Sequence, residues 1–296
     1  GMAGMSQGTP NNLVSSRSEW SMISYLGRFN YNYLSKYYAT VSFRADGSSK
    51  FVADNRFGYF PSFSLAWNFT EENFMRPLKS ILNSGKLRAS WGLTGNNRVG
   101  EYDTYAQLMI LKATQGDYSS STGITHGVYP FNNNVSNAGA VPYSLPNKDL
   151  KWESTGQTNI GIDLSFLEDK INITLDWYNK ITSNLLLQAT LVPSSGYGSA
   201  MKNIGKVENQ GIEFTINTTN VKNKNFTWTT DFNISFNYNK VLGLSENQTA
   251  MLTNGYFDQN FTSPNYIAKL HYPMGMMYGY IYEGTYKLDE FDFDGT

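Results

Sequence analysis

The sequence contains no cysteine among its 296 residues. Disulfide bonds, thiol nucleophiles and cysteine-ligated metals are therefore excluded from it. Histidine occurs only at His126 and His271, which are far apart and have no carboxylate at metal-ligand spacing. We therefore predict no catalytic residue, no metal ligand and no cofactor-binding residue of these types.

Charge is also scarce. Charged residues make up 16% of the chain, against roughly 25% in soluble domains. The 23 basic and 24 acidic residues give a formal net charge of −1. Such a balance offers nucleic acid no basic surface, so nucleic acid is not an expected partner.

Long apolar runs are missing as well. The longest are residues 108–111 and 185–187, far short of a membrane-spanning helix. The first five residues show no basic region followed by an apolar core, so they are not a signal peptide. Of the two explanations, a removed leader or a missing segment, we favour the missing segment.

The sequence is rich in aromatic residues, and within several segments apolar and polar residues alternate strictly. Aromatics reach 15%, with 21 Tyr and 18 Phe. In residues 226–238 nearly every even position is apolar, as in Phe226, Phe232 and Phe236, and every odd position is polar. Side chains of a strand point to opposite faces with period two, so this segment is a strand with one apolar and one polar face.

The same alternation recurs along the chain, whereas a helical period is confined to about one turn near residues 70–75. We therefore predict an all-β fold. The other alternating segments are residues 25–33, 39–44, 59–69, 87–94, 160–166, 171–177, 212–216 and 276–282.

The connections between these strands alternate in length. Short ones lie at residues 34–36, 168–170 and 219–225, and long ones at 45–58, 95–150, 188–207 and 243–266. Outer-membrane barrels have short turns at one rim and long loops at the other. This pattern favours an antiparallel transmembrane β-barrel over a soluble or surface β-sandwich that binds carbohydrate, which remains the alternative. A glycoside hydrolase is less favoured because no acid/base pair of carboxylates can be identified.

About nine strands can be counted, and residues 291–296 are polar. An open sheet edge is not tolerated in lipid. We therefore expect residues 1–296 to be part of a barrel domain that further strands complete, without a plug domain.

Five local motifs, in order along the chain, resemble those of SusC/RagA-type TonB-linked outer-membrane proteins. They span most of residues 24–284. The motifs are residues 44–51 with 55–62, residues 87–96, residues 147–153 with 159–163, residues 194–197 with 203–213, and residues 275–284.

This resemblance implies a barrel of about 22 strands around an N-terminal plug. It also implies energy from the TonB complex, a SusD-like surface lipoprotein as partner, and import of glycans or oligopeptides across the outer membrane of a Gram-negative, Bacteroidetes-like bacterium. The protein would then be no enzyme. The plug, the segment that TonB contacts and the closing strands would lie outside this sequence.

Two groups of aromatic residues are candidate contact residues. Those in long loops either stack on sugar rings or pack the loops together, and the sequence does not decide between these roles: Tyr102, Tyr105, Tyr118, Tyr129, Phe131 and Tyr143. Those near short turns are expected to anchor the barrel at the membrane interface, because an aromatic ring with a polar tip suits that zone: Tyr31, Tyr33, Tyr37, Tyr38, Trp177 and Tyr178.

Charged residues on the polar rows have two interpretations. They contact a plug or substrate, or they satisfy one another across neighbouring strands, which we favour. They are Arg28, Arg44, Arg88, Asp163, Asp176, Glu213 and Asp231. Asp289, Asp292 and Asp294 resemble a calcium loop but lack its later Glu, so we interpret them as an acidic loop.

Overall fold

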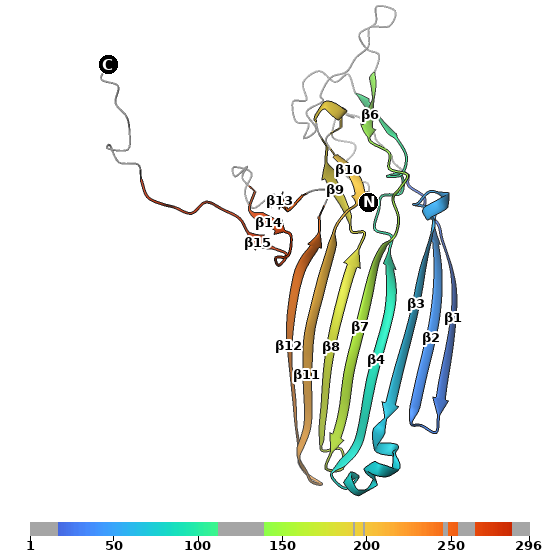
Figure 1. Ribbon diagram of the computed structural model, residues 1–296, viewed down its shortest axis with the longest axis vertical. Coiled ribbons are helices and arrows are strands. Elements are labelled where there is room, and N and C mark those ends of the chain that lie inside the picture. Colours follow the sequence, from blue (N-terminus) through green and yellow to red (C-terminus); the bar gives the residue numbers. More distant parts are fainter. Residues whose placement is uncertain are drawn as a thin grey trace, which may run out of the picture.

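The computed structural model describes residues 17–111, 139–191, 193–197, 199–244, 248–253 and 264–285. Its main body is one eight-stranded antiparallel sheet in which neighbouring strands follow chain order (Figure 1). The strands are β1 (Met22–Tyr33), β2 (Tyr37–Ser48), β3 (Phe57–Asn68), β4 (Leu82–Asn96), β7 (Glu153–Phe166), β8 (Ile171–Ser183), β11 (Lys206–Lys222) and β12 (Thr227–Gly243). The predicted all-β antiparallel fold is confirmed.

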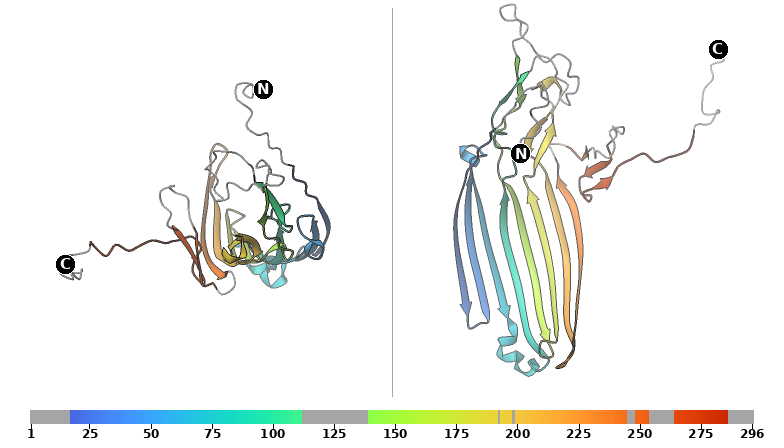
Figure 2. Two further views of the ribbon diagram at one scale, coloured as in Figure 1. Left: turned by 90° about the horizontal axis from the view of Figure 1, so that it is seen from above. Right: turned by 180° about the vertical axis from the view of Figure 1, so that it is seen from behind.

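Smaller β elements lie at the end of the sheet where the long connections are (Figures 1 and 2). They are the pair β5 (Gln107–Leu111) and β6 (Gly139–Ser144), the pair β9 (Leu186–Thr190) and β10 (Ser199–Asn203), and the trio β13 (Ala250–Thr253), β14 (Tyr266–Lys269) and β15 (Met276–Met277). The strand predicted over residues 276–282 is wrong beyond Met277, since residues 278–285 form no strand.

Helical structure among the described residues is limited to 3-10 turns. They are η1 (Ala53–Asn55), η2 (Phe69–Glu71), η3 (Asn73–Leu78) and η5 (Pro193–Ser195). The turn predicted near residues 70–75 is thus present, as η2 and η3. No helix of the described residues is long and apolar enough to cross a membrane.

The register aligns the strands so that the whole sheet has one apolar and one polar face. One row of paired residues crosses all eight strands with apolar side chains: Tyr31, Ala39, Leu65, Ala89, Ile160, Trp177, Ile212 and Phe236. The adjacent row is polar apart from a glycine: Asn30, Thr40, Ser64, Ser90, Asn159, Tyr178, Gly211 and Asn237. We call these two sides the apolar face and the polar face.

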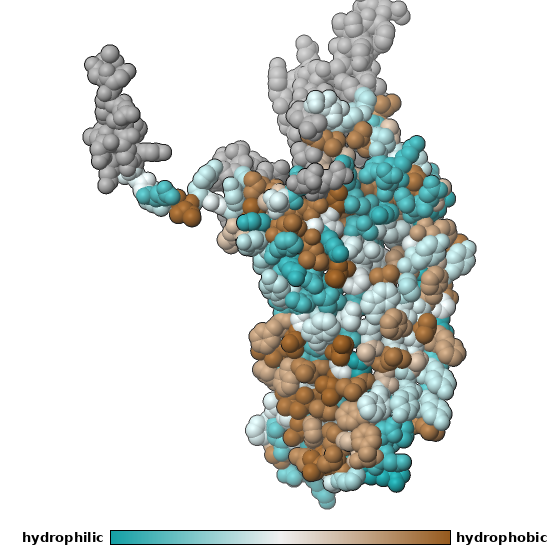
Figure 3. All heavy atoms as spheres, viewed as in Figure 1, coloured by the Kyte–Doolittle hydropathy of each residue, from teal (hydrophilic) through white to brown (hydrophobic). Residues whose placement is uncertain are grey.

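The apolar face is open. Phe29 and Phe236 are each 66% exposed, and Phe63 is 50% exposed. Figure 3 shows this face as a broad hydrophobic surface, and in Figure 2 it lies on the outer side of the curved sheet. A β-sandwich would cover it with a second sheet, and no described element does so. An exposed apolar surface of this extent marks a membrane or protein contact.

The strands are tilted relative to the short-turn rim. The row that contains Tyr33, the last residue of β1, reaches β12 at Ile234, whereas β12 begins at Thr227. The rim therefore moves along the strands from one side of the sheet to the other. Such a stagger accompanies strand tilt in a barrel wall.

The buried core lies at the long-loop end, where Phe51, Phe60, Val99, Leu150 and Trp152 form one cluster. The Trp152 ring lies 5.5 Å from that of Phe51 and 5.6 Å from that of Phe60. Its indole N–H donates to the carbonyl of residue 56 at 3.0 Å. Several of the motifs that carry the family resemblance thus meet in this cluster, which fixes the bases of the long connections.

Candidate functional site

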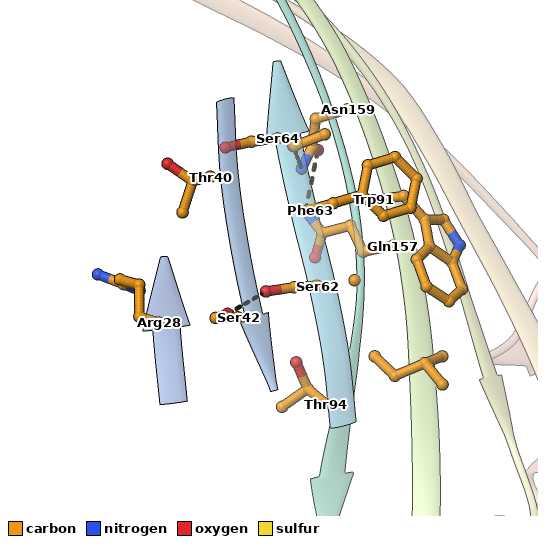
Figure 4. Close-up of a pocket in the computed structure, with 13 residues that line it drawn as sticks. Arg28, Thr40, Ser42, Ser62, Phe63, Ser64, Trp91, Thr94, Gln157 and Asn159 are labelled. Atoms are coloured by element: carbon orange, nitrogen blue, oxygen red, sulfur yellow. Dashed lines mark hydrogen bonds between the residues drawn. The ribbon is translucent and has the colours of Figure 1, made fainter. Parts of the chain in front are cut away.

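The polar face contains a hollow of about 360 Å³ that reaches from β1 to β7 (Figure 4). Hydroxyl and amide groups supply most of its lining. The lining residues on this face are Arg28, Thr40, Ser42, Ser62, Ser64, Ser90, Gly92, Thr94, Gln157 and Asn159. Short side chains in adjacent strands leave the space that longer side chains would fill.

Hydrogen bonds between neighbouring strands and along one strand order this lining. The hydroxyls of Ser42 and Ser62 lie 2.6 Å apart, and the side-chain amide of Gln157 donates to Asn159 at 3.0 Å. Arg28 is exposed and has no hydrogen-bond or ion-pair partner within the described residues. The hollow therefore offers neutral donors and acceptors together with one cation, which suits a ligand bearing hydroxyl or amide groups.

A charged cluster lies beside the hollow, toward the short-turn rim. Arg88 Nε donates to Asp163 Oδ2 at 2.7 Å, and Arg88 Nη2 lies 3.0 Å from Asp176 Oδ1. The hydroxyl of Thr174 donates to Asp163 at 3.2 Å. These three charged residues form the hydrogen-bonded lining that the sequence favoured, so neither carboxylate is free to act as an acid or base.

Gly161 permits that cluster. It is paired with Arg88 on one side and with Asp176 on the other. A Cβ at this position would lie 2.1 Å from Asp176 Oδ1 and 2.8 Å from Arg88 Nη2. The missing side chain therefore lets the guanidinium reach across an intervening strand.

The remaining charged candidates on the polar face differ in whether they have a hydrogen-bond partner. Arg44 Nε donates to Asp46 at 2.7 Å, and Asn217 donates to Asp231 at 2.6 Å. Glu213, like Arg28, has no hydrogen-bond or ion-pair partner among the described residues. Within the same residues, no three His, Asp or Glu side chains gather as a metal site requires.

Tyr31, Tyr33 and Tyr37 lie beside the β1–β2 turn on the apolar face, with the Tyr31 and Tyr33 rings stacked at 6.5 Å. The Tyr37 hydroxyl donates to Glu72 Oε1 at 2.6 Å. Lys36 Nζ donates to Glu72 Oε2 at 3.0 Å. These hydrogen bonds hold the pKa of the Glu72 carboxyl below its usual value. The positions suit an interfacial girdle, which stays a prediction.

The structure corrects the other expected interfacial aromatics. Trp177 faces the apolar side but lies in the middle of β8 rather than near a turn. Tyr178 lies on the polar face, where it covers Gly211 and donates its hydroxyl to Asn237 at 3.0 Å. Tyr38 also falls in a polar row, with its hydroxyl donating to the carbonyl of residue 35 at 3.1 Å. Consecutive strand residues point to opposite faces, so Tyr178 and Tyr38 cannot share the lipid side with their neighbours.

The loop aromatics are only partly described. Tyr102 and Tyr105 follow β4 and are 45% and 54% exposed, and the Tyr102 hydroxyl accepts a hydrogen bond from the backbone N–H of residue 19 at 3.4 Å. Tyr143 lies in β6, but its side chain is outside the described residues. Also outside them are Tyr118, Tyr129, Phe131, His126 and the acidic group Asp289, Asp292 and Asp294.

The serine, threonine and amide residues of the hollow were missed as site candidates from the sequence. Their signal was present, because they occupy the polar positions of the period-two alternation and are unusually small there. What the sequence lacked was the register that brings them together.

The curved sheet, its continuous apolar face and its hydrogen-bonding polar face define the wall of a transmembrane β-barrel. Comparison with known families agrees: residues 4–296 match the family model "TonB dependent receptor-like, beta-barrel". The chain belongs to this family, which consists of receptors and transporters rather than enzymes.

Individual relatives show which kind of TonB-dependent receptor this chain resembles. The chain is 36% identical over 226 residues to the TonB-dependent receptor SusC of Bacteroides thetaiotaomicron. This alignment covers 76% of this chain and 21% of SusC. It is 35% identical over 281 residues to the TonB-dependent receptor P3 of Formosa agariphila. That alignment covers 94% of this chain and 26% of the receptor P3. The SusC/RagA-type assignment is therefore confirmed, and the chain spans about a quarter of the length of these relatives.

A solved structure agrees at the level of the fold. The "RagAB peptide transporter" superimposes with a TM-score of 0.72 at 23% identity, over 92% of this chain and 27% of that one. The alternative of a β-sandwich is therefore wrong, because both the family and the uncovered apolar face belong to a barrel wall.

Proposed function

We propose that this chain forms part of the wall of an outer-membrane importer, through which a large, polar and uncharged nutrient such as an oligosaccharide passes. The observation that carries the proposal is the polar face, whose hollow is lined mostly by hydroxyl and amide groups, with Arg28 as its one charged side chain. Such groups exchange hydrogen bonds with a hydroxylated solute without binding it as tightly as charges would. Oligopeptides are the second substrate class that this lining accommodates.

The same proposal assigns the partners. The TonB complex supplies the energy, through parts of the receptor other than this sheet, and a SusD-like surface lipoprotein delivers the substrate at the long-loop end. Outer-membrane lipid covers the apolar face in a Gram-negative, Bacteroidetes-like cell. The kinship with SusC supports these assignments.

Transport rather than catalysis is the proposed activity. The two carboxylates nearest the hollow, Asp163 and Asp176, are both bound by Arg88. An acid/base pair for glycoside hydrolysis needs one carboxyl that holds a proton and one that does not. Two carboxylates that share one guanidinium do not provide the proton-holding member of such a pair.

The test is to fractionate cells that produce the full-length receptor and extract the outer membrane in detergent. We expect a band whose mobility changes on heating, copurification of a surface lipoprotein, and uptake of an oligosaccharide that stops when TonB is deleted. A receptor in the soluble fraction would overturn the proposal. Uptake that persists without TonB would reject its energetics, and uptake of peptides alone would reject its substrate class.

A further inference from the structure

The apolar face is hollowed at one place between β1 and β7, by a groove of about 560 Å³. Ala39 and Ala89 flank Leu65 in one register row, and Tyr31 and Ile160 continue this row on either side. Two small side chains between larger ones leave room that a flat barrel surface would not have. Tyr31 lies on the edge strand β1, and the other lining residues lie on the inner strands β2, β3, β4 and β7.

The end of the groove nearest the short-turn rim has ordered walls. Tyr37 and Trp67 stand there, and both donate to Glu72 Oε1, at 2.6 Å and 3.4 Å. Lys36 Nζ donates to the other oxygen of the same carboxylate at 3.0 Å. With their polar ends fixed, the two rings do not turn into the groove and close it.

The position of the groove indicates its occupant. It opens on the face that a barrel of this family turns to lipid, and no described segment covers it. Its lining is apolar, while its rim end meets the Lys36–Glu72 ion pair. A molecule that fits both ends has a long apolar tail and a head group that carries a cation and an anion.

We propose that this groove binds one acyl chain of a zwitterionic phospholipid, whose head group lies beside Lys36 and Glu72. The tail runs from the rim past Trp67 toward Ala89 and contacts protein on more than one side. A chain in the groove therefore buries more surface than one lying on the flat remainder of the apolar face.

The test uses the full-length receptor, purified with phosphatidylethanolamine and transferred to increasing concentrations of detergent. Native mass spectrometry then counts the phosphatidylethanolamine molecules retained. Ala39→Phe fills the groove, and Ala89→Leu fills it from the other side of Leu65. Val41→Phe is the matched control, because Val41 is 55% exposed on the same face of β2 but does not line the groove.

We expect Ala39→Phe and Ala89→Leu to weaken retention of the last phosphatidylethanolamine about tenfold, equivalent to lost contact with roughly two methylene groups. Val41→Phe should retain it like the wild type. If one groove variant does not reach the folded, heat-modifiable form, the other decides. Equal retention in all folded variants would overturn the proposal. So would loss of receptor dimers without loss of lipid, which would assign the groove to a second copy of the chain.

Discussion

Arg88 and Asp163 are 75 residues apart in the sequence, yet they form a two-pronged ion pair across β4 and β7, with Nε and Nη2 of Arg88 at 2.7 Å and 3.0 Å from the two carboxylate oxygens. Asp176 of β8 binds the same guanidinium. One cation thus ties three neighbouring strands on the polar face, next to the hollow that we assign to solute passage.

Replacing Arg88 by Ala leaves Asp163 and Asp176 close together without their shared cation. We expect the free energy of unfolding to fall by about 1–2 kcal/mol, a value discounted because all three side chains are partly exposed. Urea unfolding of the receptor in detergent micelles measures this. Arg28→Ala is the matched control, since Arg28 faces the same side without a described partner, and should stay within about 0.5 kcal/mol of wild type. Equal effects of the two substitutions would contradict the assigned role of Arg88.

Gly161→Ala tests the close approach that the cluster requires. The added methyl would overlap Asp176 Oδ1 and Arg88 Nη2, so we expect a loss of about 1–3 kcal/mol from overpacking and broken ion pairs. Gly27→Ala on the apolar face is the control, because a Cβ there meets nothing within 4 Å. In an Arg88→Ala background the cost of Gly161→Ala should shrink, and strict additivity of the two changes would argue against a shared cluster.

Trp152→Ala tests the core at the long-loop end. The ring is 8% exposed and packs on Phe51 and Phe60, and such truncations cost about 3–5 kcal/mol. We expect this loss of stability to speed proteolysis of the long connections, while the barrel itself stays folded and keeps its heat-modifiable band. Tyr105→Ala, which removes an exposed ring from the same end, should leave the cleavage rate unchanged. Loss of the whole barrel in Trp152→Ala would show that the loop core is not a separate unit.

Glu72 gives the short-turn rim a pH dependence. Its pKa is lowered in the folded protein by hydrogen bonds from Tyr37 and Lys36, relative to an ordinary value of 4.5. The stabilisation is therefore complete above pH 4.5 and is lost as the pH falls through the lower folded-state pKa. Glu72→Gln should lower stability at neutral pH and flatten the loss in acid. Heat-modifiability across pH measures this, with the exposed Glu71→Gln as control; an unchanged acid profile in Glu72→Gln would contradict the account.

These relationships show which parts of the molecule the sequence could predict. The faces of Ile160 and Asn159 follow from alternation, which is local and needs no knowledge of the partner strand. Counting from Ile171 by the same rule places Trp177 on the apolar face and Tyr178 on the polar face. Grouping both residues as interfacial aromatics failed for Tyr178 because it used proximity in the sequence instead of strand parity. It failed for Trp177 because that residue lies in the middle of β8, away from the turns.

Other features depend on register and could not be predicted. The approach of Arg88 to Asp163 requires the pairing of β4 with β7 across a long connection. Phe51 and Trp152 lie in irregular segments where period two ends, so no local pattern shows that they are buried together. The hollow likewise exists only where Ser42 and Ser62 meet their neighbours on the strands from β1 to β7.

A barrel wall requires that one face of this sheet meets lipid and the other meets water. This chain has no cysteine of its own, so in a receptor freed of any other cysteine spin labels can be attached one at a time at positions 157–160 and 162–164 of β7. Position 161 is left out because a side chain there would meet Asp176 and Arg88. In full-length receptor reconstituted in bilayers, we predict that oxygen, which concentrates in lipid, relaxes labels at Thr158, Ile160, Ile162 and Leu164 most strongly. A water-soluble nickel complex should reach the labelled odd positions better than it reaches these four. Accessibility without a period of two, or exclusion of oxygen from the even positions, would contradict a membrane-spanning wall.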